Sequence, residues 1–212
     1  MRKLLGSIVV LSLIFFVQAC APKAQEDCGF VQNSYGERVS WKGDIPINLQ
    51  IHQDVPDSMV PAIVAAAESW EKTVGRKLFN VITSPRYSGH IAPNKDGVNV
   101  IYFMPSWESD RSSEQGRTSV YWVGDQIKEA DVRLNGADFS YYWNSQTLTK
   151  AVKTGRALVP VNIEALVLHE LGHVLGLKHK DDSGSVMATY LASGEDRVAV
   201  ASADEKALQC EY

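Results

Sequence analysis

The sequence predicts one α+β domain built around a mixed sheet, preceded by an N-terminal export signal. Its 212 residues, 45% hydrophobic and 22% charged, are typical of a globular domain of ordinary size. Stretches with strand and helix patterns follow one another closely, and no repeat or low-complexity linker marks a second domain. The net charge is −4, with no basic block, so we do not expect nucleic acid as a partner.

The first 19 residues have the pattern of a secretory signal peptide. Two basic residues precede an uncharged apolar run over 4–17, which is shorter than the roughly 20 residues of a membrane-spanning helix. The run ends in Val-Gln-Ala-Cys at 17–20, which resembles a bacterial lipoprotein box and implies cleavage before Cys20 and lipidation of it. We therefore expect an exported protein, lipid-anchored in a bacterial cell envelope. The alternative is an ordinary signal peptide with a coincidental cysteine.

Residues 20–40 are expected to form the lipidated N-terminus and a tether, and residues 41–212 the folded domain. If Cys20 carries lipid, Cys28 and Cys210 are the remaining thiols of a chain in an oxidising compartment. We expect them to form a disulfide that ties the start of the mature domain to its last turn.

The first expected strand and helix follow directly. Apolar residues alternate with polar ones from Ile45 to Ile51, which indicates a strand with one buried face and puts His52 on the polar register. Asp57 and Ser58 can cap the next segment, where apolar residues recur at helical spacing over 60–74 before Gly75 stops the helix. We therefore expect an amphipathic helix over 60–74 that packs its apolar side on a sheet containing the strand 45–51.

Four further strands are expected before the second helix. Their ranges are 78–83, 98–104, 118–123 and 127–134, and the turn Gly124-Asp125 joins the last two as a hairpin.

The second long helix carries the strongest signal in the chain, His-Glu-Leu-Gly-His-Val-Leu-Gly-Leu-Lys-His at 169–179. His169 and His173 are one helical turn apart on one face, so both imidazoles can reach the same zinc ion. Gly176 can adopt the left-handed conformation that ends a helix, and the resulting turn lets His179 act as a third ligand. Asn162 is the expected cap of this helix.

Three protein ligands leave a fourth position of one catalytic Zn²⁺ open for water. Glu170 projects beside the metal and is the natural general base for hydrolysis by a zinc-activated water. The plain alternative, a helix with merely buried or solvated histidines, does not explain the placement of a third histidine behind the glycine.

These residues resemble the signature of the metzincin zinc endopeptidases, H-E-x-x-H-x-x-G-x-x-H followed by a methionine turn. Ser-Val-Met at 185–187 stands in the place of that turn. The resemblance implies that Met187 packs beneath the imidazoles without ligating. Within the clan the chain is most similar to matrixins, through 129–135, which precedes the active-site helix, and through the closing helix at 202–208. The resemblance to matrixins covers most of residues 41–212.

The resemblance also implies an architecture, namely a zincin-like fold with a twisted mixed five-stranded sheet. An active-site helix and a backing helix pack on this sheet, and a C-terminal subdomain follows the glycine of the zinc motif. The edge strand 118–123 would form the upper rim of a cleft, where a protein or peptide substrate adds through main-chain hydrogen bonds. The pocket wall would come from about 188–200, and we assign Tyr190 no metal role.

Three points depart from the family or stay open. Additional structural calcium or zinc is not expected, and the loop containing His90 and Asp96 is interpreted as a solvated surface loop. Cys28, followed by glycine, could imitate the family's inhibitory cysteine instead of forming the disulfide. The functional alternative to an active, monomeric endopeptidase is a catalytically silent envelope lipoprotein that binds a partner. Retention of Glu170 favours the enzyme.

Overall fold

The computed structural model describes residues 24–150 and 159–212. The expected signal peptide over 1–19 and the lipidation site Cys20 lie outside these residues. The central feature is a five-stranded sheet in the order β2-β1-β3-β5-β4, in which only β4 is antiparallel to its neighbour. Its strands are β1 (Ile47–His52), β2 (Phe79–Tyr87), β3 (Asn99–Met104), β4 (Gly116–Val123) and β5 (Gln126–Asn135). The predicted α+β class and five-stranded mixed sheet are confirmed.

Strand β4 lies at the edge of the sheet, as expected for the rim of a cleft. It pairs with β5 over its whole length, with Thr118 opposite Val132. Gly124 has a φ of 64° in the connecting turn, a conformation that glycine adopts without steric cost, so the predicted hairpin is present. The other edge of β4 is not paired with any strand in the described part of the chain.

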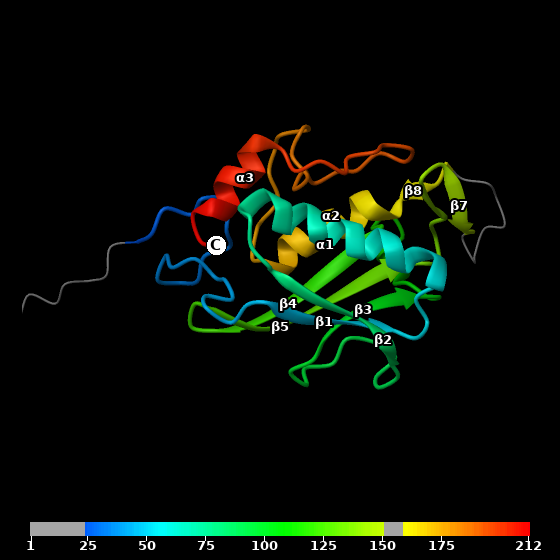
Figure 1. Ribbon diagram of the computed structural model, residues 1–212, viewed down its shortest axis with the longest axis horizontal. Coiled ribbons are helices and arrows are strands. Elements are labelled where there is room, and N and C mark those ends of the chain that lie inside the picture. Colours follow the sequence, from blue (N-terminus) through cyan, green and yellow to red (C-terminus); the bar gives the residue numbers. More distant parts are fainter. Residues whose placement is uncertain (1–23, 151–158) are drawn as a thin grey trace, which may run out of the picture.

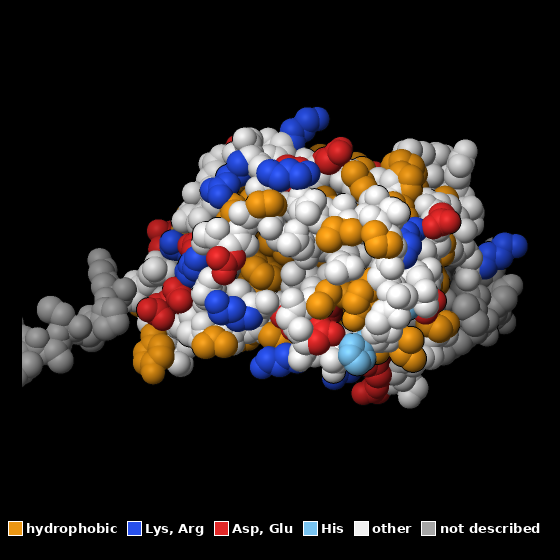
Figure 2. All heavy atoms as spheres, turned by 60° about the horizontal axis from the view of Figure 1, so that its bottom comes forward, with side chains coloured by type: hydrophobic (Ala, Val, Ile, Leu, Met, Phe, Trp, Pro, Cys, Tyr) orange, Lys and Arg blue, Asp and Glu red, His pale blue; other side chains and the backbone are white. Residues whose placement is uncertain are grey.

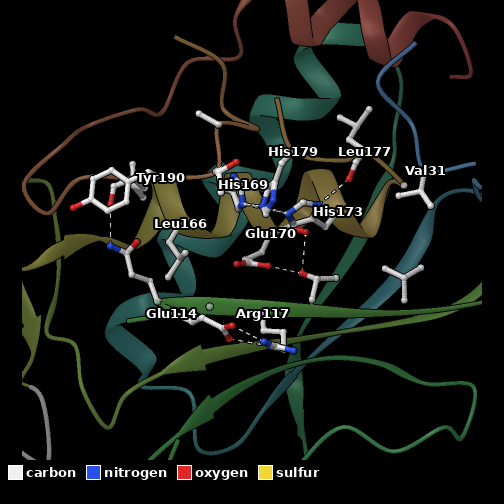
Figure 3. Close-up of a pocket in the computed structure, with 18 of the residues that line it drawn as sticks. Val31, Glu114, Arg117, Leu166, His169, Glu170, His173, Leu177, His179 and Tyr190 are labelled. Carbon is white, nitrogen blue, oxygen red and sulfur yellow. Dashed lines mark hydrogen bonds and ion pairs between the residues drawn. The ribbon is translucent and has the colours of Figure 1, made fainter. Parts of the chain in front are cut away.

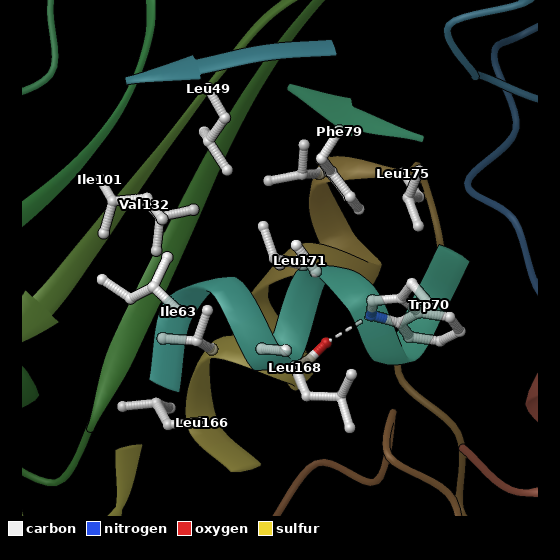
Figure 4. Close-up of a cluster of buried hydrophobic side chains, with 14 of the residues drawn as sticks. Leu49, Ile63, Trp70, Phe79, Ile101, Val132, Leu166, Leu168, Leu171 and Leu175 are labelled. Carbon is white, nitrogen blue, oxygen red and sulfur yellow. Dashed lines mark hydrogen bonds between the residues drawn. The ribbon is translucent and has the colours of Figure 1, made fainter. Parts of the chain in front are cut away.

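Two long helices, α1 (Val60–Val74) and α2 (Ile163–Val174), lie on one side of the sheet (Figure 1). They bury apolar side chains against the sheet and against each other, and Figure 4 shows Leu49, Ile63, Ile101 and Val132 among them. The indole N–H of Trp70 on α1 donates to the carbonyl of Leu168 on α2, at 2.8 Å. Helix α1 thus holds α2 both by packing and by a buried hydrogen bond.

The start of α1 differs from the prediction. Asp57 and Ser58 do not cap the helix, because a 3-10 turn, η1 (Asp57–Met59), precedes it and no side chain bonds to its end. Pro61 stands in the first turn of α1 and has no N–H to be capped. Asp57 instead pairs with Arg86 at 2.6 Å. Gly75, with a φ of 67°, ends the helix as predicted.

Several elements were not anticipated. A small sheet in the order β7-β6-β8 is made of β6 (Tyr141–Trp143), β7 (Gln146–Thr149) and β8 (Val161–Asn162), and a 3-10 turn, η2 (Ser109–Arg111), precedes β4. The closing helix α3 (Ser202–Gln209) was anticipated and lies next to the C-terminus (Figure 1). No helix in the described residues is long and apolar enough to cross a membrane.

The segment 28–40 is packed onto the body of the domain. A disulfide joins Cys28 to Cys210, with 6.3 Å between the Cα atoms. Phe30 is fully buried and forms an isolated bridge with Leu177. The folded body therefore includes residues that the sequence pattern assigned to the tether.

The side of the sheet away from α1 and α2 is itself partly covered. His52 occupies the polar register, as expected, yet it is only 1% exposed and packs against Tyr102, with 5.3 Å between the ring centroids. Glu129 and Asp131 on β5 are also buried. On the face in Figure 2, charged side chains of both signs are interspersed with small hydrophobic groups.

Candidate active site

Helix α2 presents the histidine motif, and its ends are well defined. The Asn162 side chain accepts hydrogen bonds from the backbone N–H groups of Glu164 and Ala165 at 2.9 and 3.2 Å, so the predicted cap is confirmed. At the other end Gly176 has a φ of 100°, and a Cβ there would collide with the carbonyl oxygen of Val39. Only glycine allows this turn, which brings the chain back to His179.

The structure brings the three predicted histidines together. The Nε2 atoms of His169 and His173 are 3.2 Å apart, and that of His179 lies 3.0 Å from His173 and 3.3 Å from His169. A tetrahedral zinc ion with bonds of roughly 2.0–2.1 Å needs ligand nitrogens about 3.3 Å apart. The three side chains therefore fit one such ion, and they are the one metal-sized cluster of this kind in the described residues.

Backbone carbonyls orient two of the imidazoles. His169 Nδ1 donates to the carbonyl of Val186 at 2.7 Å, and His173 Nδ1 donates to that of Leu177 at 2.8 Å. A proton on Nδ1 leaves the Nε2 lone pair free for a metal. Burial lowers the pKa of both imidazoles to about 4, so both are neutral and able to ligate near pH 7.

Glu170 lies between α2 and the edge strand, 4% exposed, and Figure 3 shows it pointing toward the strand that carries Arg117. Its Oε2 accepts a hydrogen bond of 2.6 Å from the hydroxyl of Thr118. Burial raises the pKa of the Glu170 carboxyl, which His173 and the Thr118 hydroxyl lower in part. A buried carboxylate beside three converging imidazoles is placed to exchange a proton with a reacting group.

The segment in the place of the methionine turn contacts helix α2 and His169. Met187 is fully buried, and a side chain at Gly172 of α2 would collide with its sulfur. Asp204 on α3 holds this turn, since Oδ2 accepts from the N–H of Val186 at 2.9 Å and Oδ1 from the Ser185 hydroxyl at 2.6 Å. Val186 is also the residue whose carbonyl orients His169.

Sequence reasoning missed Asp204 and Thr118. Asp204 shares the buried face of α3 with Ala207 and Leu208, so an acidic residue at apolar helical spacing was the available signal. Thr118 lay within the expected rim strand, but alternation alone cannot say which face of an edge strand meets α2.

A cavity of about 790 Å³ opens along the histidines. It lies between α2, the edge strand β4 and the segment after the methionine turn, and Leu166 and Tyr190 line one end while Val31 lines the other (Figure 3). The side-chain amide of Gln115 donates to the carbonyl of Leu191 at 2.9 Å and so ties the pocket wall to the start of β4. Residues of β4 from Gly116 to Trp122 line the cavity, so a bound chain would lie against this strand.

The remaining candidates are not part of the histidine cluster, although Tyr190 lines the same cavity. Cys28 is bonded to Cys210, so the inhibitory-thiolate interpretation is wrong for this structure. His90 is exposed in the loop after β2, with Nε2 3.9 Å from a carboxylate oxygen of Asp96. Tyr190 is 74% exposed.

The family comparison agrees with this geometry. The family described as matrixin matches residues 16–212. No curated protein matches the chain. With the five-stranded sheet, the histidine triad and the methionine turn in one fold, this match over nearly the whole sequence shows that the chain belongs to the matrixin family of metallopeptidases.

Proposed function

We propose that the protein is a zinc-dependent endopeptidase in which His169, His173 and His179 hold one Zn²⁺ and Glu170 is the general base. One observation carries the proposal, the convergence of three imidazole nitrogens within 3.0–3.3 Å of one another beside a buried carboxylate. A structural role alone does not require this arrangement, because three neighbouring imidazoles gain nothing from one another without a shared ligand.

When bound, zinc supplies a Lewis acid that polarises the scissile carbonyl and makes the attacking water more acidic. The protein's own groups handle the proton. Thr118 occupies Oε2 of Glu170, so Oε1 is free to take the proton from the water. Glu170 then returns the proton to the leaving amine, which completes hydrolysis of the peptide bond. The raised pKa of Glu170 brings it nearer to the pH at which it must both accept and release a proton.

The proposed substrate is an extended stretch of protein or peptide. The outer edge of β4 is free of strand partners in the described residues, and its main chain can bond to an added strand. Such binding tolerates many sequences, so selectivity would come from the cavity wall at Thr189, Tyr190 and Leu191.

Cleavage of casein, measured with and without a chelator, tests this function. We expect chelation to abolish cleavage, added zinc to restore it, and His179→Ala to remove both activity and bound zinc. His90→Ala is the matched control, because this histidine is exposed and outside the site. A zinc-loaded wild-type chain that cleaves neither casein nor gelatin would contradict the proposal and favour the binding lipoprotein.

We propose further that the enzyme works at a bacterial cell envelope, anchored by lipid on Cys20. The lipoprotein-like sequence before Cys20 supports this location. Intact-mass analysis of protein exported by a bacterial host should find residues 1–19 removed and a lipid-sized addition on Cys20. An unmodified Cys20 would contradict the anchor without affecting the proposed chemistry.

A further inference from the structure

The carboxylate of Glu170 is held by the same strand that would bind substrate. The hydroxyl of Thr118 lies 2.6 Å from Oε2 of Glu170 and 3.2 Å from the backbone carbonyl oxygen of Glu170. A hydroxyl has one proton to donate, and the shorter contact makes the carboxylate the main acceptor. Hydrogen bonds to an ionised acceptor at such a distance are among the stronger ones in proteins.

Gly116 shapes the other side of the same carboxylate. It precedes Thr118 by two residues, so both project from the same face of β4. A Cβ at Gly116 would lie 2.7 Å from Oε1 and 3.2 Å from Cδ of Glu170. The distance to Oε1 is shorter than real Cβ contacts and the distance to Cδ is tighter than most of them, and the neighbouring Arg133 carbonyl, at 3.3 Å, limits any shift. The missing side chain therefore leaves the space in which Oε1 lies.

The polar residue between Gly116 and Thr118 has a partner of its own. Arg117, between these two residues, projects from the opposite face of the strand and pairs with Glu114 through Nε at 3.0 Å. In the described part of the chain, Thr118 makes the one side-chain hydrogen bond found at the Glu170 carboxylate.

We propose that Thr118 and Gly116 are positioning residues for the general base. The hydroxyl of Thr118 fixes Oε2, and the bare backbone at Gly116 admits Oε1, so the substrate-binding strand also sets the orientation of Glu170. This inference rests on the proposed endopeptidase function. Strand β4 would then both bind the substrate and orient Glu170, so a shift of the strand would also move the general base.

The first test compares Thr118→Val, which keeps the shape but loses the hydroxyl, with Thr118→Ser, which keeps the hydroxyl. Loss of a hydrogen bond to a charged group should lower kcat for a fluorogenic peptide by about 10- to 100-fold. KM should change less than about threefold, and Thr118→Ser should keep kcat within about threefold of wild type. Zinc content should stay equal in all variants.

Thr73→Val is the matched control, because Thr73 on α1 also donates a hydroxyl hydrogen bond, to Ser69 at 2.9 Å, but lies outside the cleft. It should leave kcat unchanged. Gly116→Ala should lower kcat as Thr118→Val does, since its Cβ displaces Oε1. Unchanged kcat in Thr118→Val, or equal losses in Thr118→Val and Thr118→Ser, would overturn the positioning role.

A binding measurement separates this inference from the proposed function. A peptide hydroxamate should chelate the zinc ion and place its own hydroxyl beside the base, so its affinity reports the orientation of Glu170 without turnover. We expect Thr118→Val to weaken hydroxamate binding about tenfold in the wild-type background and not at all in Glu170→Ala. If the wild type binds the hydroxamate but cleaves no peptide, the proposed function fails while this cycle still decides the role of Thr118. An equal effect in both backgrounds, or no binding by the zinc-loaded wild type, overturns the inference.

Discussion

Two buried carboxyl groups lie on opposite sides of the β4–β5 ladder, and their surroundings differ. Glu170 reaches the inner side of β4, where it accepts the Thr118 hydroxyl and borders the histidine cavity. Asp131 projects from β5 to the outer side, where Oδ1 accepts from the N–H of Val100 at 3.0 Å and Oδ2 lacks a hydrogen bond. Burial raises the pKa of both groups.

This difference is the reason that we propose a catalytic role for Glu170 and none for Asp131, although both are buried. Glu170 has a hydroxyl that fixes one oxygen, imidazoles that can share a metal, and a cavity for substrate. The pKa of Asp131 is raised mainly by burial and further by the like charges of Glu129 and Asp96, and the hydrogen bond from the Val100 N–H offsets this only in part. We therefore assign chemistry to the first group and only a cost in stability to the second.

The largest effect is expected from Glu170→Gln, which keeps the shape of the side chain but removes its ability to take a proton. Catalytic efficiency should fall by about 10²–10⁴-fold. Zinc content should stay at one equivalent, and the free energy of unfolding at pH 8 should not decrease, because a buried charge is lost. Peptide kinetics and metal analysis decide this, and near wild-type turnover would remove Glu170 from the mechanism.

Another buried carboxylate, Asp204, extends the comparison, since it holds the methionine turn through hydrogen bonds to Ser185 and Val186. Asp204→Asn should weaken zinc binding by roughly 10- to 100-fold, because Val186 would orient His169 less well. Competition with a chromophoric chelator measures the affinity. Glu205→Gln, the next residue on α3, is the control and should not change it. Equal zinc affinity in Asp204→Asn and the wild type would show that this support is dispensable.

Asp131→Asn tests the outer side of the ladder. In the folded chain the pKa of Asp131 is raised to about 7, against 3.8 for an unperturbed carboxyl, so folding favours the protonated form. The stability it contributes is present below pH 4 and is lost as pH rises toward 7, by at most about 4 kcal/mol.

Asp131→Asn should remove this pH dependence and raise the free energy of unfolding above pH 7, because the buried charge is lost. The expected gain is only about 1–2 kcal/mol, because the new amide leaves buried polar atoms without hydrogen bonds. Urea unfolding at pH 5 and pH 8 measures it, and peptidase activity should be retained. A less stable variant at pH 8 would mean that a partner, such as a bound cation, balances the Asp131 charge.

The smallest effect is expected at an exposed carboxylate on the same side. Glu108 is 2.8 Å from Arg133, and this hydrogen bond lowers the pKa of Glu108, so any stability it adds is lost as pH falls through that pKa. Its side chain is 44% exposed, and water screens the pair. Glu108→Gln should change the free energy of unfolding by less than about 0.5 kcal/mol at pH 7. A change above 2 kcal/mol would show that the exposed Glu108 matters as much to stability as the buried Asp131.

The inner side of the molecule was readable from sequence because its constraints are local. Helix geometry fixes the spacing of His169, His173 and Gly176, and Asn162 caps the helix that it begins. Both features could therefore be predicted without knowing any contact between residues far apart in sequence. The strands followed from alternation, and the edge position of β4 followed from the family resemblance. The disulfide between Cys28 and Cys210 was predicted by elimination, on the expectation that the chain is exported and that Cys20 carries lipid.

The outer side and the supports of the site depend on contacts far apart in sequence. Alternation places His52 and Asp131 on the polar register but cannot show that other segments cover them. The contact of Thr118 with Glu170 spans 52 residues, and no local pattern encodes it. Asp57 looked like a helix cap, yet the 3-10 turn and a distant arginine changed its role.

Titration of the metal-free chain with zinc, followed by cleavage of a quenched fluorescent peptide, tests the central claim most directly. If the three histidines hold the catalytic ion, the rate should rise in proportion to added zinc and stop rising at one equivalent per chain. Glu170→Gln, titrated alongside, should bind the same single equivalent without gaining activity. A wild-type chain that binds one zinc ion at these histidines and cleaves no peptide, or one that cleaves peptides equally well without zinc, would contradict the account.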